Sequence, residues 1–365
     1  MKINISNATF SSIVGIGQKV KAASAKSGEK YLELNRGVNS VVDIDLSGIM
    51  KHINPNSKGF QVYAPNLGID SLRKSILNEY FPTKNEIENI AITPGGMPAL
   101  DLVIQILNVE NIYFPHFYWG SYSKMATIRK KQFSFYESLE NLDYSKLNES
   151  TAIFVCDPNN PTGVKLDDDF LLKHIEKINE TGAIVIFDSP YRKLFYDDNF
   201  FDKISNLDNV IITESFSKWL GLSGLRIGFI WSKNKEFNSE LNIRLLYEFN
   251  AVSSVPQLIV DAVLSTNEGK TTRDNFRMET TSSIVKNIDF LKKNNLLVKE
   301  IYGEDTPIGI FAIINKSEDY LFKNKIGAVG LDKFTYHKKD KWSRYSRICV
   351  SVNHDEFKEF IKKII

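Results

Sequence analysis

Lys218 and Arg226 are the residues of this chain whose types and spacing most clearly permit chemistry. Lys218 closes the segment Ser215-Phe216-Ser217-Lys218, and Arg226 follows eight positions later, among several glycines. The run before this segment, 211–214, is typical of the end of a strand. A lysine amine condenses with a carbonyl, while hydroxyls and a guanidinium hold a phosphate. The segment therefore suits an aldehyde that bears a phosphate, although a solvated loop accounts for the same residues when they are taken alone.

A second set of polar residues follows two other apolar runs. Asn160 lies in the string 157–163, where two prolines and a glycine indicate an irregular loop that holds an amide rigidly. Asp188 closes the apolar run 183–187. Burial of its carboxylate there is costly in free energy unless a cation lies beside it. A protonated pyridine nitrogen would be such a cation. Asn160 and Tyr191 are then candidates to hydrogen-bond a phenolic oxygen on the same ring. Alternatively, Asp188 is the N-cap of the helix that follows.

Three further segments extend this set. Pro94-Gly95-Gly96-Met97 opens a helical pattern, so its backbone N–H groups can bind phosphate oxygens, although a plain tight turn has the same sequence. Trp119 offers a flat indole that can stack on a pyridine ring or belong to a core aromatic cluster. Arg347 begins an apolar run, and its guanidinium can bind a carboxylate through two parallel hydrogen bonds or face solvent.

The elements that must position these residues form an alternating pattern. Short β-rich runs and longer helical patterns succeed each other, which predicts parallel strands joined by helices. Because ligands collect at the carboxyl ends of parallel strands, we expect the polar residues to converge there. The predicted strands are 89–93, 111–114, 151–155, 183–187 and 210–213, and the predicted helices are 71–80, 98–107 and 168–179. A long helix at 274–295, strands at 308–314 and 347–352, and a last helix at 355–363 indicate a smaller unit.

Composition excludes several other classes. The 365 residues, 42% hydrophobic and 25% charged, are typical of a soluble globular protein larger than one usual domain. The formal charge of +2 gives no electrostatic case for a nucleic-acid partner. Two cysteines in apolar runs and five scattered histidines favour neither a disulfide framework nor a metal site. Since no apolar stretch reaches the length of a membrane span or a secretion-signal core, we expect a cytoplasmic enzyme without a membrane partner.

Taken together and in this order, the motifs resemble the fold-type I pyridoxal-phosphate aminotransferases of class I/II, from about Leu32 to the C-terminus. The most specific strings are Asn160-Pro161-Thr162-Gly163, Asp188 with Tyr191, and Ser215-x-x-Lys218 with Arg226; the segment 63–73 adds to them. The resemblance implies an α/β fold whose large domain, 46–255, holds a mostly parallel, helix-covered sheet. It also implies a smaller α+β domain built from both chain ends, 1–45 and 256–365. The chain length is closer to the histidinol-phosphate aminotransferase and threonine-phosphate decarboxylase subgroup.

The resemblance also implies roles for individual residues. Lys218 would hold pyridoxal 5'-phosphate as a Schiff base and later shuttle the proton, and Asp188 would pair with the pyridinium nitrogen. Arg347 would clamp the substrate α-carboxylate, with Gly37 and Asn160 nearby. The implied cofactor-binding residues are Gly95, Gly96, Met97, Trp119, Asn160, Asp188, Tyr191, Ser215, Lys218, Arg226 and, from the other subunit of a homodimer, Tyr63.

Two positions depart from the family pattern. Met97 replaces a polar residue common in the phosphate loop, so only its backbone N–H could contribute there. Asp157 stands where asparagine is usual, and we expect this change to be harmless.

The expected reaction is the transfer of an amino group between an α-amino acid and a 2-keto acid. One alternative keeps the cofactor but changes the reaction at Cα, as a β-lyase, a decarboxylase, or an oxidase or cyclase. Another is a non-catalytic regulatory module of the same fold, which is disfavoured because all the catalytic positions are present. The identities of the amino donor and acceptor do not follow from these motifs.

Overall fold

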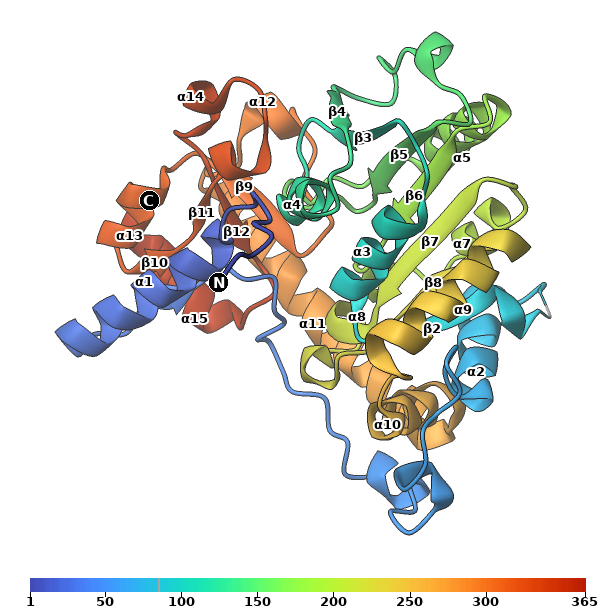
Figure 1. The fold of residues 1–365 in the computed structure, drawn as a ribbon. Helices are drawn as coiled ribbons and strands as arrows, with labels where there is room; N and C mark the ends of the chain where they lie inside the picture. Colours follow the sequence, from blue (N-terminus) through green and yellow to red (C-terminus); the bar gives the residue numbers. More distant parts are fainter. Residues whose placement is uncertain (85) are drawn as a thin grey trace.

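A computed structural model describes residues 1–84 and 86–365 of the protein. Its largest feature is a seven-stranded sheet flanked by helices (Figure 1). The strand order is β2-β8-β7-β6-β5-β3-β4, and every pairing is parallel except those that β8 makes with β2 and β7. The strands are β2 Ile90–Thr93, β3 Asn111–Pro115, β4 Phe133–Tyr136, β5 Thr151–Cys156, β6 Ile184–Asp188, β7 Val210–Ser215 and β8 Gly228–Trp231.

Both faces of this sheet are covered, which explains why its central strands are almost entirely buried and contain apolar runs. Helices α3 (Gly96–Ile106), α4 (Ser121–Ile128) and α9 (Lys235–Phe249) pack on one face. Helices α2 (Asp70–Tyr80) and α5 (Asp168–Glu180) pack on the other, together with the short helices α6 (Arg192–Phe195), α7 (Phe200–Ile204) and α8 (Phe216–Trp219). Helix α10 (Ser254–Ser265) packs against α2.

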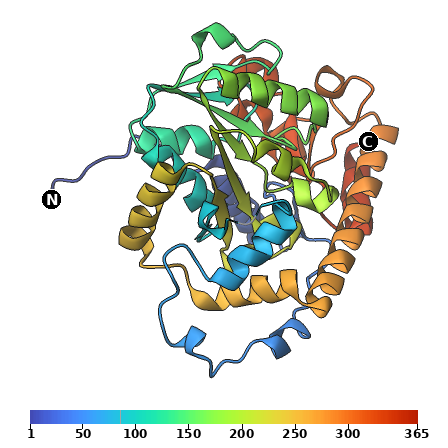
Figure 2. The ribbon, with the colours of Figure 1, turned by 90° about the vertical axis from the view of Figure 1, so that its right-hand side faces the viewer.

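A smaller unit is built from both ends of the chain. Strand β1 (Leu32–Glu33) pairs with β10 (Ile326–Gly327), and β9 (Phe311–Ile314), β12 (Ser346–Cys349) and β11 (Val329–Gly330) form an antiparallel sheet. Its helices are α1 Ser12–Ser27, α12 Lys299–Tyr302, α13 Glu318–Lys323, α14 Lys339–Trp342 and α15 His354–Ile361. Helix α11 (Asn267–Lys293) leads into it from α10, as the two ribbon views show (Figures 1 and 2).

The fold class expected from the sequence is confirmed, with a mostly parallel helix-covered sheet and a smaller α+β domain made by both chain ends. The division at 45/46 and 255/256 stays a prediction. Of the residues that the structure describes, none belongs to a helix long and apolar enough to cross a membrane.

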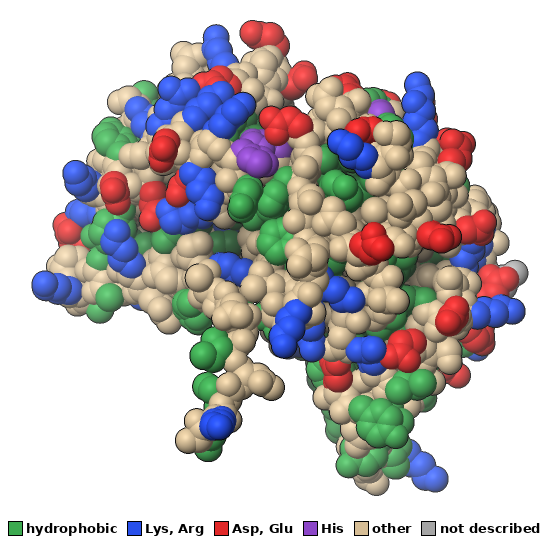
Figure 3. Space-filling view, turned by 45° about the horizontal axis from the view of Figure 1, so that its top comes forward, with side chains coloured by type: hydrophobic (Ala, Val, Ile, Leu, Met, Phe, Trp, Pro, Cys, Tyr) green, Lys and Arg blue, Asp and Glu red, His purple; other side chains and the backbone are tan. Residues whose placement is uncertain are grey.

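Two segments project from the body of the molecule. The N-terminal arm, residues 1–10, extends away from the body in Figure 2, and both it and the excursion at 45–65 project in the space-filling view (Figure 3). The base of the excursion packs against α10 through its 3-10 helices Ile49–His52 and Lys58–Phe60 (Figure 1). Both segments carry large exposed apolar side chains: Ile3, Ile5 and Phe10 on the arm, and Met50, Val62 and Tyr63 on the excursion.

Candidate active site

The predicted polar residues converge at the carboxyl ends of three neighbouring parallel strands. Strands β5, β6 and β7 lie side by side, and the segments that follow them carry Asn160, Tyr191 and Lys218. Asp188 and Ser215 are themselves the last residues of β6 and β7. This edge of a parallel sheet is where ligands bind in open α/β folds.

Lys218 lies in the last turn of α8, where it meets the N-terminal segment of the chain. Its Nζ donates a hydrogen bond to the carbonyl of Gly37. Burial lowers the pKa of Lys218 to about 8, and the positive charges of Arg347, Arg226 and Arg36 act in the same direction. An amine with this pKa is partly neutral near neutral pH, as a nucleophile or a general base requires.

Asp188 is a buried carboxylate without a cationic partner. It is 5% exposed and accepts hydrogen bonds from the hydroxyls of Tyr122 and of Thr213, the latter at 3.2 Å. Burial raises the pKa of Asp188 to about 6. Because no lysine, arginine or histidine of the described chain contacts it, this carboxylate is matched to a cationic group of a ligand.

Trp119 contacts Tyr122, which in turn hydrogen-bonds Asp188. Its indole packs edge-to-face on the ring of Tyr122, with centroids 5.6 Å apart at 85°, and the Tyr122 hydroxyl donates to Asp188. Trp119 lies just before α4, whose N-cap is Gly120, and its carbonyl accepts a hydrogen bond at 3.0 Å from the N–H of Tyr122 in the first turn of that helix.

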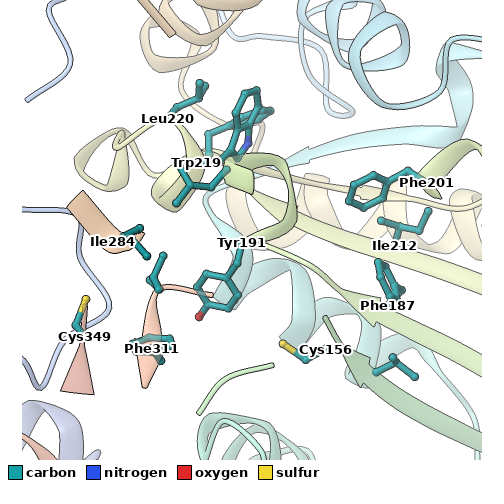
Figure 4. Close-up of a cluster of buried hydrophobic side chains, with 14 of the residues drawn as sticks. Cys156, Phe187, Tyr191, Phe201, Ile212, Trp219, Leu220, Ile284, Phe311 and Cys349 are labelled. Carbon is teal, nitrogen blue, oxygen red and sulfur yellow. The ribbon is translucent and has the colours of Figure 1, made fainter. Parts of the chain in front are cut away.

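Asn160 joins Tyr191 to Arg347. The Asn160 amide donates from Nδ2 to Tyr191 Oη at 3.2 Å, and its Oδ1 accepts from Arg347 Nη1 at 2.9 Å. Tyr191 is buried, and its ring projects toward Phe311 of the small domain (Figure 4). One amide therefore links a large-domain phenol to a small-domain guanidinium.

Arg347 is a buried cation without an anionic partner. It is 1% exposed, and its Nη2 donates to the carbonyl of Asn35 at 2.5 Å. Nε is buried and has no partner in the described residues, and burial lowers the pKa of Arg347 to about 10. No carboxylate within the described ranges pairs with Arg347, so the guanidinium suits an anionic group of a ligand.

A cradle of glycine backbone, hydroxyl and guanidinium lies at the N-terminus of α3. A Cβ on Gly95, whose φ is 101°, would lie 2.5 Å from Arg226 Nη2, and one on Gly96 would lie 3.1 Å from Ser215 Cβ. The side chains of Arg226 and Ser215 are therefore packed directly on the two glycines. Free N–H groups at a helix N-terminus, with an arginine beside them, form a ready site for an anion such as phosphate. Met97 follows in the first turn and offers only its backbone to such an anion.

Tyr63 is the predicted site residue that does not join this group within one chain. It lies on the excursion at 45–65 and is 81% exposed. The sequence analysis also missed residues that touch the predicted ones: Asn35, Tyr122, Thr213, Phe311 and Phe334. Tyr122 carried a usable signal, since it follows Trp119 by three residues. The other four gave none, because two are aromatic residues typical of a core and two act at positions set by the tertiary structure.

The chain matches the sequence model of the family described as "Aminotransferase class I and II" over residues 31–364. Among curated relatives, it is 30% identical to histidinol-phosphate aminotransferase 2 of Archaeoglobus fulgidus over 43% of this chain and 45% of the relative. It is 28% identical to a probable aspartate aminotransferase of Methanocaldococcus jannaschii over 50% of this chain and 51% of the relative. The matched part spans about half the length of these relatives.

Solved structures give the fold over the whole chain. An aspartate aminotransferase from Thermus thermophilus, solved with maleate, superimposes with a TM-score of 0.85 at 16% identity and covers 100% of this chain and 99% of that one. An aminotransferase from Mycobacterium tuberculosis does so with a TM-score of 0.83 at 13% identity, covering 100% and 98%. At these identities, the likeness establishes the fold.

Proposed function

Since the chain belongs to the class I and II aminotransferase family, as predicted from its motifs, we propose that it transfers an amino group between an α-amino acid and a 2-keto acid with pyridoxal 5'-phosphate. One observation carries the proposal. Among the described residues, the part-buried amine of Lys218, a carboxylate without a cation, Asp188, and a guanidinium without a carboxylate, Arg347, are linked electrostatically. The charge of Arg347 acts on both Lys218 and Tyr191, and the charge of Asp188 acts on Tyr191. These three groups complement an aldehyde, a pyridinium and an amino-acid carboxylate.

The residues present fit the cofactor. Among the described residues, the carboxylate of Asp188 has hydrogen-bond donors but no cation beside it, so it suits a protonated ring nitrogen. The cradle suits a phosphate and is made by Gly95, Gly96, Ser215 and Arg226. Trp119 would stack on the ring, Asn160 and Tyr191 would hydrogen-bond its phenolic oxygen, and Met97 would offer its N–H to the phosphate. Lys218 is the amine that would hold the cofactor covalently.

The cofactor, when bound, acts as an electron sink that makes the Cα proton of an amino acid more acidic. The side chains of this protein do the rest. Asp188 would hold the proton of the ring nitrogen, and Arg347 would bind the α-carboxylate with Gly37 and Asn160 beside it. Lys218 Nζ, with a pKa of about 8, would take the Cα proton as a general base and then deliver it as a general acid to the cofactor carbon.

The same proposal includes a homodimer. Tyr63 and the other exposed apolar side chains of the two projecting segments would be covered by a second copy, and Tyr63 would then reach the cofactor phosphate of the partner. Both cysteines, Cys156 and Cys349, are free and buried, which fits a reducing compartment and supports the cytoplasm as the location.

A panel of amino donors, with 2-oxoglutarate and pyruvate as acceptors, tests the reaction. In single turnover without acceptor, an effective donor should convert the cofactor stoichiometrically to its amine form, seen in the visible spectrum, and addition of a keto acid should reverse the change. Release of ammonia or carbon dioxide with return of the starting spectrum would instead indicate elimination or decarboxylation. The absence of any donor-dependent change would overturn the proposed function.

A further inference from the structure

The guanidinium of Arg347 lies between two aromatic rings of the small domain. Its Cζ is 4.1 Å from the ring centroid of Phe311 and 4.5 Å from that of Phe334. Both rings are buried, at 2% and 1% exposure. A guanidinium attracts the face of an aromatic ring, and the attraction is largest where water is excluded.

The sheet register produces this arrangement. In the antiparallel pair of β12 and β9, Arg347 lies opposite Ile313 and Phe311 lies opposite Cys349, so Arg347 and Phe311 are diagonal neighbours on one face. Phe334 ends the short 3-10 helix Leu331–Phe334, which follows β11, the other neighbour of β12. One ring therefore comes from the strand on one side of β12, and the other from the segment that follows the strand on its other side.

Each ring is also tied to the cofactor side of the site. The Phe311 ring packs edge-to-face on Tyr191, with centroids 5.6 Å apart at 77°, and a Cβ on Gly37 would lie 2.4 Å from Phe311 Cζ. The carbonyl of Phe334 accepts a hydrogen bond at 3.0 Å from the N–H of Tyr118, the residue before Trp119. Because both rings are held by residues next to the proposed cofactor, they fix the plane of the guanidinium relative to those residues.

We propose that Phe311 and Phe334 form an aromatic clamp that fixes the plane of the Arg347 guanidinium and thereby orients the α-carboxylate of the substrate. The proposal rests on the proposed function. The two phenylalanines are positioning residues, since they act on the substrate only through Arg347. A carboxylate that binds through two parallel hydrogen bonds takes the plane of its guanidinium. The clamp therefore sets the orientation in which the α-carboxylate is bound.

Carboxylate binding by the cofactor-loaded protein tests the clamp without requiring turnover. The probes are pyruvate and pyruvamide, in which a neutral carboxamide replaces the carboxylate, and binding is followed by ligand-observed NMR. Phe311→Leu and Phe334→Leu should each weaken pyruvate binding about tenfold and pyruvamide binding less than about twofold. With an effective amino donor, the same variants should raise KM about tenfold and leave kcat within about threefold.

Phe357→Leu is the matched control. Phe357 is fully buried in α15 and makes no ring contact with Arg347, so the variant should lose stability without a change in the ratio of the two dissociation constants. Equal weakening of pyruvate and pyruvamide, or unchanged pyruvate binding in both folded clamp variants, would overturn the clamp. The panel of amino donors tests the proposed function separately. The ratio of the pyruvate and pyruvamide dissociation constants can be measured whether or not the protein transfers an amino group.

Discussion

The two sides of the candidate site are built in different ways. On the large-domain side, Asp188 and Ser215 end their own strands, and Lys218 follows Ser215 by one short helical turn. On the small-domain side, Arg347 is held by Asn160, 187 positions away, and by the carbonyl of Asn35, 312 positions away. The first side follows from strand ends within one sheet, whereas the second exists only once both chain ends have packed together.

This difference predicts a division of roles, in which one side of the site acts on catalysis and the other on substrate binding. The large-domain groups are a nucleophilic amine and a carboxylate that holds a proton, so their loss should mainly lower kcat. The small-domain groups hold a carboxylate, so their loss should mainly raise KM.

Lys218→Ala should abolish the visible band of the bound cofactor and lower turnover by roughly 10⁴-fold or more, because the variant loses both the nucleophile and the proton carrier. Absorbance and initial rates measure the two effects. Lys362→Ala, an exposed lysine near the C-terminus, is the control and should change neither. Full activity in Lys218→Ala would remove the basis of the account.

Asp188→Asn should lower kcat by roughly 10²- to 10³-fold with little change in KM, because the amide cannot hold a ring proton as a carboxylate does. Steady-state kinetics with one good donor measures the split. If KM rises in this variant while kcat is unchanged, Asp188 belongs with the groups that bind the substrate rather than with those that act in catalysis.

The same variant has a second readout, in the cofactor-free protein. Burial raises the pKa of Asp188 from its ordinary value of 3.8 to about 6, so the folded state binds this proton more tightly than the unfolded state does. Stability should therefore fall as pH rises from about 4 to 6, with a contribution from this group of about 3 kcal/mol. Urea unfolding across this window should show a weaker fall for Asp188→Asn than for the unaltered chain. An equal fall of stability with pH in the variant and the unaltered chain would contradict the assignment of the raised pKa to Asp188.

Arg347→Lys should raise KM for the amino acid by roughly 30- to 100-fold and lower kcat less, since an ammonium cannot form two parallel hydrogen bonds with a carboxylate. It should also release Asn160 Oδ1 and the Asn35 carbonyl from their present donor. A fall in kcat alone, with KM unchanged, would break the proposed division between the two sides.

Tyr63→Phe should have the smallest effect, a loss of roughly tenfold in cofactor affinity, because one hydroxyl hydrogen bond to a charged group would be removed across the dimer interface. Equilibrium dialysis of the cofactor measures it. Sedimentation analysis should give a dimer for both proteins, whereas a monomer that binds the cofactor fully would contradict the shared site.

The same contrast explains what could be predicted from the sequence. Asp188 was found because a charge at the end of an apolar strand is costly and therefore conspicuous. Lys218 was found because an amine beside two serines, with Arg226 eight positions later, suits an aldehyde that bears a phosphate. Phe311 and Phe334 were missed because buried aromatic residues have the composition of any core, and only the register of β9 and β12 brings one of them beside Arg347.

The fold shows the same limit. Buried strands that contain an apolar run, such as β5 and β7, were predicted close to their observed bounds, and the long helix α11 was predicted with a late start. Strands β4 and β8 were not predicted. Strand β4 lies at the edge of the sheet and only its last residue is buried, and β8 begins at Gly228, the last of the glycines that follow Lys218. Tyr63 remains a prediction that depends on a second subunit.

Reductive trapping tests the central claim most directly. The purified protein is loaded with pyridoxal phosphate, reduced with borohydride, digested and mapped by mass spectrometry. The account predicts one stoichiometric cofactor adduct, on the peptide that contains Lys218, and its loss in Lys218→Ala. An adduct confined to another lysine, or no adduct at all in a folded protein, would contradict it.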